Sequence, residues 1–248
     1  KGKGVVAINT TPDGENDMQP TTRMQALYQW TKRTQEVLAH RSIQGLSFHR
    51  LYNLMRTKRL VEVSLDKVLR NKGAITPGVD GITKEDLATA EDRAQLVDEI
   101  HRELCAKTYK PLPVRRTYVP KPGKAEKRGL GIPTIKDRVV QEMLRAILEP
   151  IYEAKFYKHS YGFRPFRSTH HAALRCKHLI GRWGYTHAVE GDIRACFDRI
   201  QHLKLLKILR KTIKDERIIR LIRDMLKAGC MDDGAWHVTD EGIPQGGI

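Results

Sequence analysis

The sequence lacks the features of a membrane-spanning or secreted protein. No run of 18 apolar residues occurs in its 248 residues, and its start, "KGKGVVAINT", has no long apolar core followed by a small-residue cleavage site. The four cysteines are scattered, and none forms a CxxC pair or has a spacing to histidine that is typical of zinc sites. We therefore expect reduced thiols, a cytoplasmic location and no membrane partner.

Acidic residues are scarce relative to basic ones. Lys and Arg total 45 against 29 Asp and Glu, which gives a formal net charge of +16 and an isoelectric point near 9.8. A fold does not need such an excess, because like charges repel one another in a compact chain. A polyanionic partner, most often a nucleic acid, explains the excess, and the alternative is a basic protein without such a partner.

Hydrophobic periodicity predicts a helix-rich α+β chain. Residues 1–20 are rich in Gly, Thr, Pro, Asp and Asn, which predicts a flexible leader. Apolar residues at intervals of three and four predict helices over 22–71, and a glycine-rich loop follows over 71–83. After that loop, the pattern predicts a helix capped by Thr83 and ending near 106, and then a basic hairpin within 113–134. A helix from Thr134 that ends before Pro150 follows, and then a helix capped by Ser168 and ending near 180. The last predicted elements are a strand over 187–193, helices over 202–212 and 215–229, and a final hairpin.

One acidic residue lies at a position where the hydrophobic pattern predicts a buried side chain. In "HAVEGDIRACFDRI" (187–200), Asp192 ends the predicted strand, and a carboxylate in an apolar layer costs several kcal/mol unless a cation neutralises it. Carboxylates at such a position can hold Mg²⁺ beside an attacking hydroxyl and a leaving phosphate. The alternative is an aspartate that caps a turn at the end of a strand. Phe197 follows five residues later, where its ring could close a pocket beneath a sugar.

Four short stretches follow one another along the chain in an order that is typical of one protein family: "VPKPGKAEKRGLGIP", "SYGFRPFRS", "GDIRACFDRI" and "GIPQGG". In that order they resemble the reverse transcriptases encoded by group II introns, the bacterial intron maturases. The resemblance runs from about Leu51 to Ile248, roughly four-fifths of the chain. It implies the fingers and part of the palm of a right-hand polymerase, helix-rich with a small antiparallel sheet. The implied units are a leader over 1–20, an N-terminal helical extension and fingers over 21–110, fingers over 111–187, and a partial palm over 188–248.

The resemblance also implies roles for individual residues. Asp192 matches the first metal-binding aspartate of the palm, with the Ile193 carbonyl beside it, which implies Mg²⁺ as the cofactor. Phe197 matches the residue that screens the 2′ carbon of the incoming nucleotide. Lys121 and Arg128, on the two arms of the hairpin, match finger residues that grip the triphosphate. Without the resemblance, the simplest interpretation of this hairpin would be a solvated basic loop.

Two further matches complete the implied function. Gln245 matches a glutamine near the nucleotide and the template base, and Arg164 resembles a residue near the template strand. The chain is then part of an RNA-directed DNA polymerase that uses dNTPs and an RNA/DNA primer–template, and that assists the splicing and mobility of a group II intron RNA. The alternatives are an intron-binding maturase without polymerase activity, and a retron-type or diversity-generating reverse transcriptase. Basic residues of the N-terminal helices suit RNA backbone binding, or form a solvated face: Arg23, Lys32, Arg33, Arg50, Arg56, Lys58 and Arg59.

The stretch "CMDDG" contains a Met-Asp-Asp that looks like the second catalytic motif of this family. Cys230 stands where an aromatic residue belongs, and Gly234 follows the two aspartates at once, which is typical of a turn. The family also places its aspartate pair after "PQGG", so we predict that Asp232 and Asp233 lie in a turn. On this interpretation the pair would follow Ile248. We then expect the chain alone to be catalytically incomplete and able to form a homodimer through an uncovered palm strand.

Overall fold

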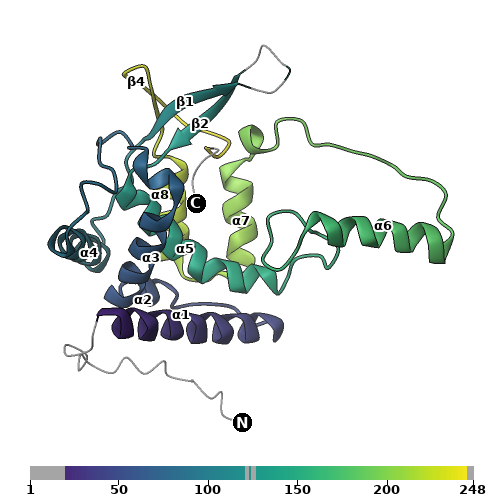
Figure 1. Cartoon of the computed structure of the whole chain (residues 1–248), viewed down its shortest axis with the longest axis horizontal. Coiled ribbons are helices and arrows are strands. Elements are labelled where there is room, and N and C mark those ends of the chain that lie inside the picture. The colour runs from purple at the N-terminus through teal and green to yellow at the C-terminus, as the bar shows by residue number, and fades with distance from the viewer. Residues whose placement is uncertain (1–19, 121–122, 124–126, 245–248) are drawn as a thin grey trace, which may run out of the picture.

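The computed structural model describes residues 20–120, 123 and 127–244, and Figure 1 shows them as a helical body with a small sheet at one end. The helices are α1 (Pro20–Ile43), α2 (Tyr52–Met55), α3 (Lys58–Arg70), the 3-10 helix η1 (Lys72–Ile75), α4 (Ala90–Ala106), α5 (Ile135–Glu153), α6 (Thr169–Trp183), the 3-10 helix η2 (Phe197–Arg199), α7 (His202–Thr212) and α8 (Glu216–Leu226). The strands are β1 (Val114–Pro120), β2 (Lys127–Ile132), β3 (Cys230–Asp232) and β4 (Ala235–His237). The predicted α+β class is confirmed. Residues 1–19 of the predicted leader fall outside the described residues, and its last residue, Pro20, begins α1.

Helix α5 lies at the centre of the body, packed against α1 and α3. Its N-cap is Thr134, whose hydroxyl accepts a hydrogen bond from the amide of Asp137 at 3.0 Å, as predicted. Six apolar residues at intervals of one, three and four are buried on one face of it, namely Ile135, Val139, Val140, Met143, Leu144 and Ile147. This helix therefore supplies much of the core on which the other helices pack.

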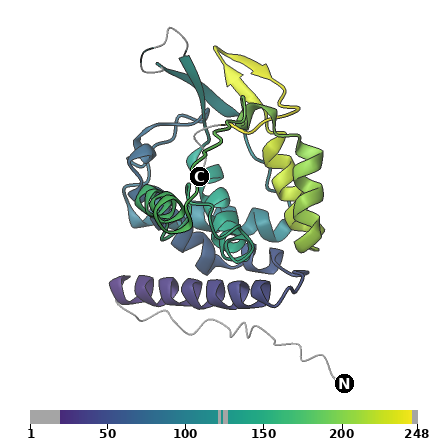
Figure 2. The same ribbon diagram turned by 90° about the vertical axis from the view of Figure 1, so that its right-hand side faces the viewer.

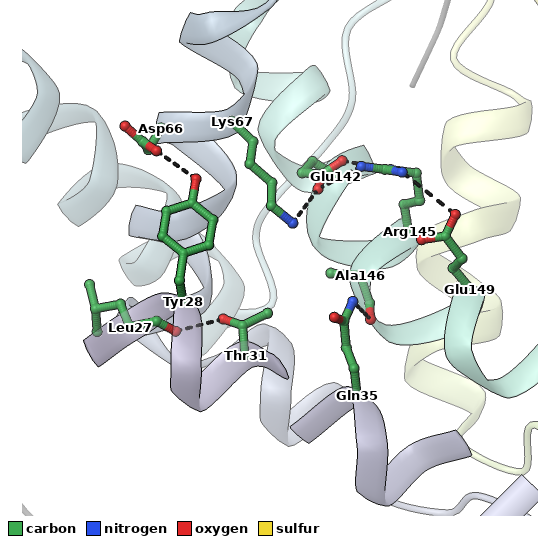
Figure 3. Close-up of polar contacts among 10 residues, drawn as sticks. All are labelled: Leu27, Tyr28, Thr31, Gln35, Asp66, Lys67, Glu142, Arg145, Ala146 and Glu149. Atoms are coloured by element: carbon green, nitrogen blue, oxygen red, sulfur yellow. Dashed lines mark hydrogen bonds and ion pairs between the residues drawn. The ribbon is translucent and has the colours of Figure 1, made fainter. Parts of the chain in front are cut away.

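The predicted end of this helix was wrong, because α5 continues through Pro150 to Glu153. Proline has no amide hydrogen, so the Ala146 carbonyl, one turn earlier, loses its helical donor. Gln35 of α1 replaces that donor, since its Nε2 lies 3.0 Å from the Ala146 oxygen (Figure 3). Ser42, also in α1, donates to the carbonyl of Ile151 at 2.6 Å. Side chains from a distant helix thus complete the backbone bonding of α5 around its proline.

A buried carboxylate ties α3 to α5. Glu142 of α5 is only 2% exposed, and it accepts from Lys67 Nζ at 3.2 Å and from Arg145 Nε at 2.7 Å (Figure 3). Two cations offset the cost of burying this one carboxylate. Beside them, Tyr28 of α1 donates to Asp66 of α3 at 2.6 Å. Burial and this hydrogen bond raise the pKa of Tyr28 to about 12, so its hydroxyl stays a donor at neutral pH.

The sheet has the order β2-β1-β3-β4. The basic hairpin is confirmed, because β1 and β2 pair antiparallel with Arg115 opposite Ile132. The second hairpin, β3–β4, is confirmed as well, and its turn residues Asp233 and Gly234 have φ values of 46° and 81°. Positive φ at both positions is typical of a type I′ turn. The predicted turn is therefore confirmed at Asp233, whereas Asp232 is the last residue of β3.

The sheet is mixed rather than antiparallel, because β1 and β3 run parallel, with Val114 opposite Cys230. Parallel neighbours need a long crossover connection, and helices α5 to α8 provide it. The hydroxyl of Tyr118 on β1 also donates to the carboxylate of Asp232 on β3. This carboxylate therefore has a partner on the sheet.

The start of α4 also differs from the prediction, while its end at Ala106 agrees with it. The helix begins at Ala90, with Thr89 as its N-cap and a reciprocal capping box to Asp92. Thr83 closes a separate turn, in which its amide donates to Asp86 at 2.8 Å. Both sites have the Thr-x-x-Asp spacing of a capping box, and only the second leads directly into the helix.

The predicted strand over 187–193 was wrong. All of residues 184–196 are described, and none of them belongs to a helix or a strand. Val189 is 100% exposed, and Asp192 is exposed as well. A strand needs a neighbour to pair its amides and carbonyls, and no strand in the described part of the chain pairs with this segment. Asp192 therefore does not lie in an apolar layer here.

The remaining predicted helices are all present. Ser168 caps α6 by accepting from the amide of His171 at 3.4 Å, and the helix projects from the body (Figure 1). Helix α7 matches its predicted range, whereas α8 ends at Leu226, three residues before its predicted end. The two helices pack on one another at one side of the body (Figure 2). Gly229, with φ of 84°, lies three residues beyond the end of α8, so it does not cap the helix directly. Among the described helices, none has both the length and the apolar composition that crossing a bilayer demands.

The Gln35–Ala146 hydrogen bond predicts a specific mutant cycle. Gln35→Leu should lower the free energy of unfolding by about 1–3 kcal/mol, because it leaves a buried carbonyl without a donor. Pro150→Ala restores an amide that can donate to Ala146, so Gln35→Leu should cost much less in that background. Urea unfolding of the four proteins measures this, with Gln29→Leu at an exposed position of α1 as the control. Equal losses in both backgrounds would contradict this account of the proline.

Candidate functional site

Residues 241–244, here called the junction segment, join the turn that carries Phe197 to the rest of the fold. The amide of Gly242 donates to the carbonyl of Ile200 at 2.8 Å, and the amide of Ile243 donates to the carbonyl of Phe197 at 2.9 Å. His202, the first residue of α7, donates from Nε2 to the carbonyl of Gly242 at 2.7 Å. Stretches separated by about 45 residues in the sequence thus form one hydrogen-bonded unit.

Glycine is required at position 242. Its φ is +80°, which L side chains rarely adopt, and a Cβ there would lie 2.8 Å from the carbonyl oxygen of Asp198. The same Cβ would lie 3.0 Å from the carbonyl oxygen of Phe197. The two backbones can approach this closely only because the residue has no side chain.

The junction segment also contacts the hairpin. A Cβ on Gly131 of β2 would lie 2.6 Å from Cβ of Pro244 and 2.8 Å from Cγ2 of Val114, so the proline packs directly on the glycine backbone. The hairpin and the turn at Phe197 are therefore held on the same short segment. The positions assigned by resemblance to sugar screening and to phosphate binding lie on elements that meet here.

A cavity of about 370 Å³ lies beside this junction. Arg116 and Gly129 of the hairpin line it, together with Asp198, Asp240 and Glu241. Three carboxylates and one guanidinium do not suit a triphosphate, because like charges would repel. The cations expected to hold phosphates must therefore act from elsewhere on the hairpin.

The structure places the predicted site residues in different surroundings. Arg128 is exposed on β2, opposite Val119, and Phe197 begins η2 with 48% exposure. Lys121 and Gln245 lie outside the described residues.

Asp192 and Ile193 are exposed in the irregular segment before η2. The described residues include no group of three or more His, Cys, Asp or Glu side chains that could hold a metal ion. The structure therefore brings Phe197 to the segment that precedes Gln245, and Asp192 belongs to no such group among the described residues.

Arg164 makes its contacts within the fold, to the loop that follows α5. Its side chain is only 7% exposed, and Nε and Nη2 contact the Glu153 carboxylate at 3.1 and 2.9 Å. Its Nη1 donates to the carbonyls of Tyr157 and Ser160, while the guanidinium stacks over the Phe156 ring. These contacts hold the loop between α5 and α6 in shape. A direct contact of Arg164 with a template stays a prediction.

The basic residues of the N-terminal helices fall into two groups. Arg23 pairs with Glu62 at 2.8 Å and Lys58 pairs with Asp98, which commits both to contacts within the fold. Exposed positions include Lys32, Arg33, Arg50 and Arg56. Helix α1 lies at the end of the body opposite the hairpin (Figures 1 and 2), so its cations form a surface separate from the junction.

His202 is the site residue that sequence reasoning missed. The pattern showed only a polar residue at the start of an amphipathic helix, which is ordinary. In the structure it is 4% exposed and contacts a carbonyl 40 residues away. No local signal shows which backbone a buried imidazole will contact.

Comparisons with known proteins agree with these motifs. Residues 119–248 match the family described as "Reverse transcriptase (RNA-dependent DNA polymerase)". The chain is 39% identical over 214 residues to Protein YkfC of Escherichia coli (strain K12), covering 82% of this chain and 54% of that protein. It is 40% identical over 203 residues to the group II intron-encoded protein LtrA of Lactococcus lactis subsp. cremoris, covering 81% of this chain and 32% of that protein.

A plant protein shares a shorter match. Nuclear intron maturase 1, mitochondrial, of Arabidopsis thaliana is 36% identical over 95 residues, which is 38% of this chain and 13% of that protein. This chain spans about half the length of the Escherichia coli relative and about a third of the Lactococcus relative.

The close approach at Gly242 predicts a graded effect of substitution. Gly234→Ala, at φ of 81° with open space around it, should cost about 1–2 kcal/mol in free energy of unfolding from backbone strain alone. Gly242→Ala has similar strain plus contact with two carbonyls, so its loss should be larger by about 1–3 kcal/mol. Urea unfolding of both variants tests this. Equal losses would show that the junction can move apart freely.

Proposed function

Because this chain belongs to the reverse transcriptase family, among the group II intron-encoded proteins, we propose that it forms the fingers and part of the palm of an RNA-directed DNA polymerase. The observation that carries the proposal is the junction segment, which holds the Phe197 turn and the hairpin of Arg128 together. In this proposal the dNTP lies at that meeting point. Lys121 and Arg128 bind its phosphates, Phe197 lies beneath its sugar, and Gln245 lies near its base.

We propose Mg²⁺ as the cofactor of this site. The carboxylate of Asp192 and the carbonyl of Ile193 are oxygen donors, which Mg²⁺ prefers, and both residues are exposed to a ligand. Magnesium sites in such enzymes commonly take one or two carboxylates and complete their shell with water and substrate phosphates. The ion would supply positive charge against the reacting phosphates. Asp192 and Ile193 would hold it from the protein side.

The nucleic-acid partners in this proposal are a group II intron RNA and an RNA/DNA primer–template. The net charge of +16 and the exposed cations of α1, such as Lys32 and Arg33, support binding to a phosphate backbone. Because α1 lies far from the hairpin, this surface also favours a second candidate function, a maturase that binds the intron RNA and promotes splicing without DNA synthesis. The homodimer and the cytoplasmic location stay predictions from the sequence.

Asp192→Asn tests the polymerase proposal. In the protein expressed from its complete reading frame, this variant should lose primer extension by about 100-fold or more, because an amide carries no charge to hold Mg²⁺. RNA affinity should stay within about twofold, since the carboxylate is not proposed to contact RNA. Asp233→Asn, on the hairpin turn, is the matched control and should extend primers normally, because a type I′ turn accepts Asn. Normal extension by Asp192→Asn would refute the assignment.

Salt dependence tests the nucleic-acid partner. The affinity of the chain for structured RNA should fall steeply with salt, by roughly 0.7–0.9 in log–log slope for each phosphate neutralised. Replacing both Lys32 and Arg33 by Gln should lower that slope, whereas the same change at Lys214, which already donates to the carbonyl of Arg210, should not. Filter binding between 50 and 300 mM KCl measures the slope. A flat affinity over that range would contradict a phosphate-binding surface.

A further inference from the structure

The imidazole of His202 is buried at the junction segment, where an apolar side chain would be expected. It is 4% exposed at the first position of α7, and its Nε2 lies 2.7 Å from the carbonyl oxygen of Gly242. A carbonyl can only accept a hydrogen bond, so Nε2 is the donor in this contact. Nδ1 has no hydrogen-bond partner among the described residues. The fold therefore keeps a half-satisfied imidazole in its interior, at a cost that an apolar residue would avoid.

Within the described part of the chain, the imidazole of His202 makes one hydrogen bond, and that bond lies where two segments meet. Gly242 donates through its amide to Ile200 and accepts through its carbonyl from His202, so both of its backbone groups are held. The next amide, that of Ile243, donates to the carbonyl of Phe197. Without the imidazole, the Gly242 peptide would be held from one side only.

The turn that carries Phe197 depends on this external support. Ala195, two residues earlier, has φ of +52°, which is strained for a residue with a side chain. Within the turn, the amide of Arg199 donates to the carbonyl of Ala195 at 3.1 Å. The amides of Gly242 and Ile243 hold the turn from outside, and the imidazole in turn holds Gly242.

We propose that His202 is a positioning residue for nucleotide selection. Its hydrogen bond to Gly242 sets the depth of the Phe197 ring relative to the segment that leads to Gln245, and thereby the room left for a 2′-hydroxyl. This inference rests on the proposed function of Phe197 at the sugar of the incoming nucleotide. His202 itself does not touch the substrate.

The test compares three variants of the protein expressed from its complete reading frame. His202→Leu fills the space without a donor. His202→Gln carries an amide nitrogen at a reach similar to Nε2 and should restore the bond. Tyr52→Phe, in α2, is the matched control. It removes another buried hydrogen bond from a side chain to a carbonyl, the one from the Tyr52 hydroxyl to Leu104 at 2.9 Å. Steady-state incorporation of dNTP and rNTP, RNA affinity and thermal unfolding are measured for each.

His202→Leu should raise KM for dNTP and reduce the preference for dNTP over rNTP by about fivefold to tenfold, the scale of one lost hydrogen bond. RNA affinity should not change. His202→Gln should recover most of the preference, and Tyr52→Phe should lose stability with its sugar preference intact. If His202→Leu does not fold, His202→Asn, whose amide is too short to reach Gly242, takes its place.

An unchanged sugar preference in folded His202→Leu or His202→Asn would overturn the inference while leaving the polymerase intact. The same loss of preference in Tyr52→Phe would also overturn it, because the effect would then follow stability alone. Failure of the unmodified protein to extend any primer would overturn the proposed function, and the inference with it. Phe197→Val further distinguishes the proposed function from this inference, because it should admit rNTP whether or not His202 sets the position of the ring.

Discussion

The amide of Ile243 donates a hydrogen bond to the carbonyl of Phe197, and the candidate site depends on that contact. It can form only because Gly242 has no side chain and adopts a positive φ, which lets the two backbones approach. Once the junction segment is held there, Pro244 packs on Gly131 of the hairpin. A sugar-screening turn and a phosphate-binding hairpin, as we propose them, are thereby linked through four residues.

The helical body keeps this junction in place. Helix α5 leads directly from the hairpin through the core, and its burial makes it the common support of α1 and α3. Two sets of polar contacts hold it in place. One is the buried Glu142 between Lys67 and Arg145, and the other is the hydrogen bond from Gln35 to the carbonyl of Ala146, which Pro150 leaves without a helical donor. A shift of α5 would move the base of the hairpin, so these distant contacts bear on the geometry of the site.

Much of the fold could be predicted from local pattern. Helix caps such as Thr134 and the turn at Asp233 follow from short-range chemistry that the sequence displays directly. The strand over 187–193 could not be predicted correctly, because a strand exists only where a partner pairs with it, and apolar alternation carries no information about that partner. The same limit hid the parallel pairing of β1 with β3. It also hid the contacts of Arg164 and His202, whose partners lie in other elements.

The central claim is that the hairpin, the Phe197 turn and the junction segment form one nucleotide site. Amide hydrogen exchange tests it most directly, on the protein from its complete reading frame with a chain-terminated primer on an RNA template. Adding the next complementary dNTP with Mg²⁺ should slow exchange in residues 127–132, 197–201 and 241–244 together, and a mismatched dNTP should not. Protection confined to one of these three segments, or lying wholly outside them, would contradict the account.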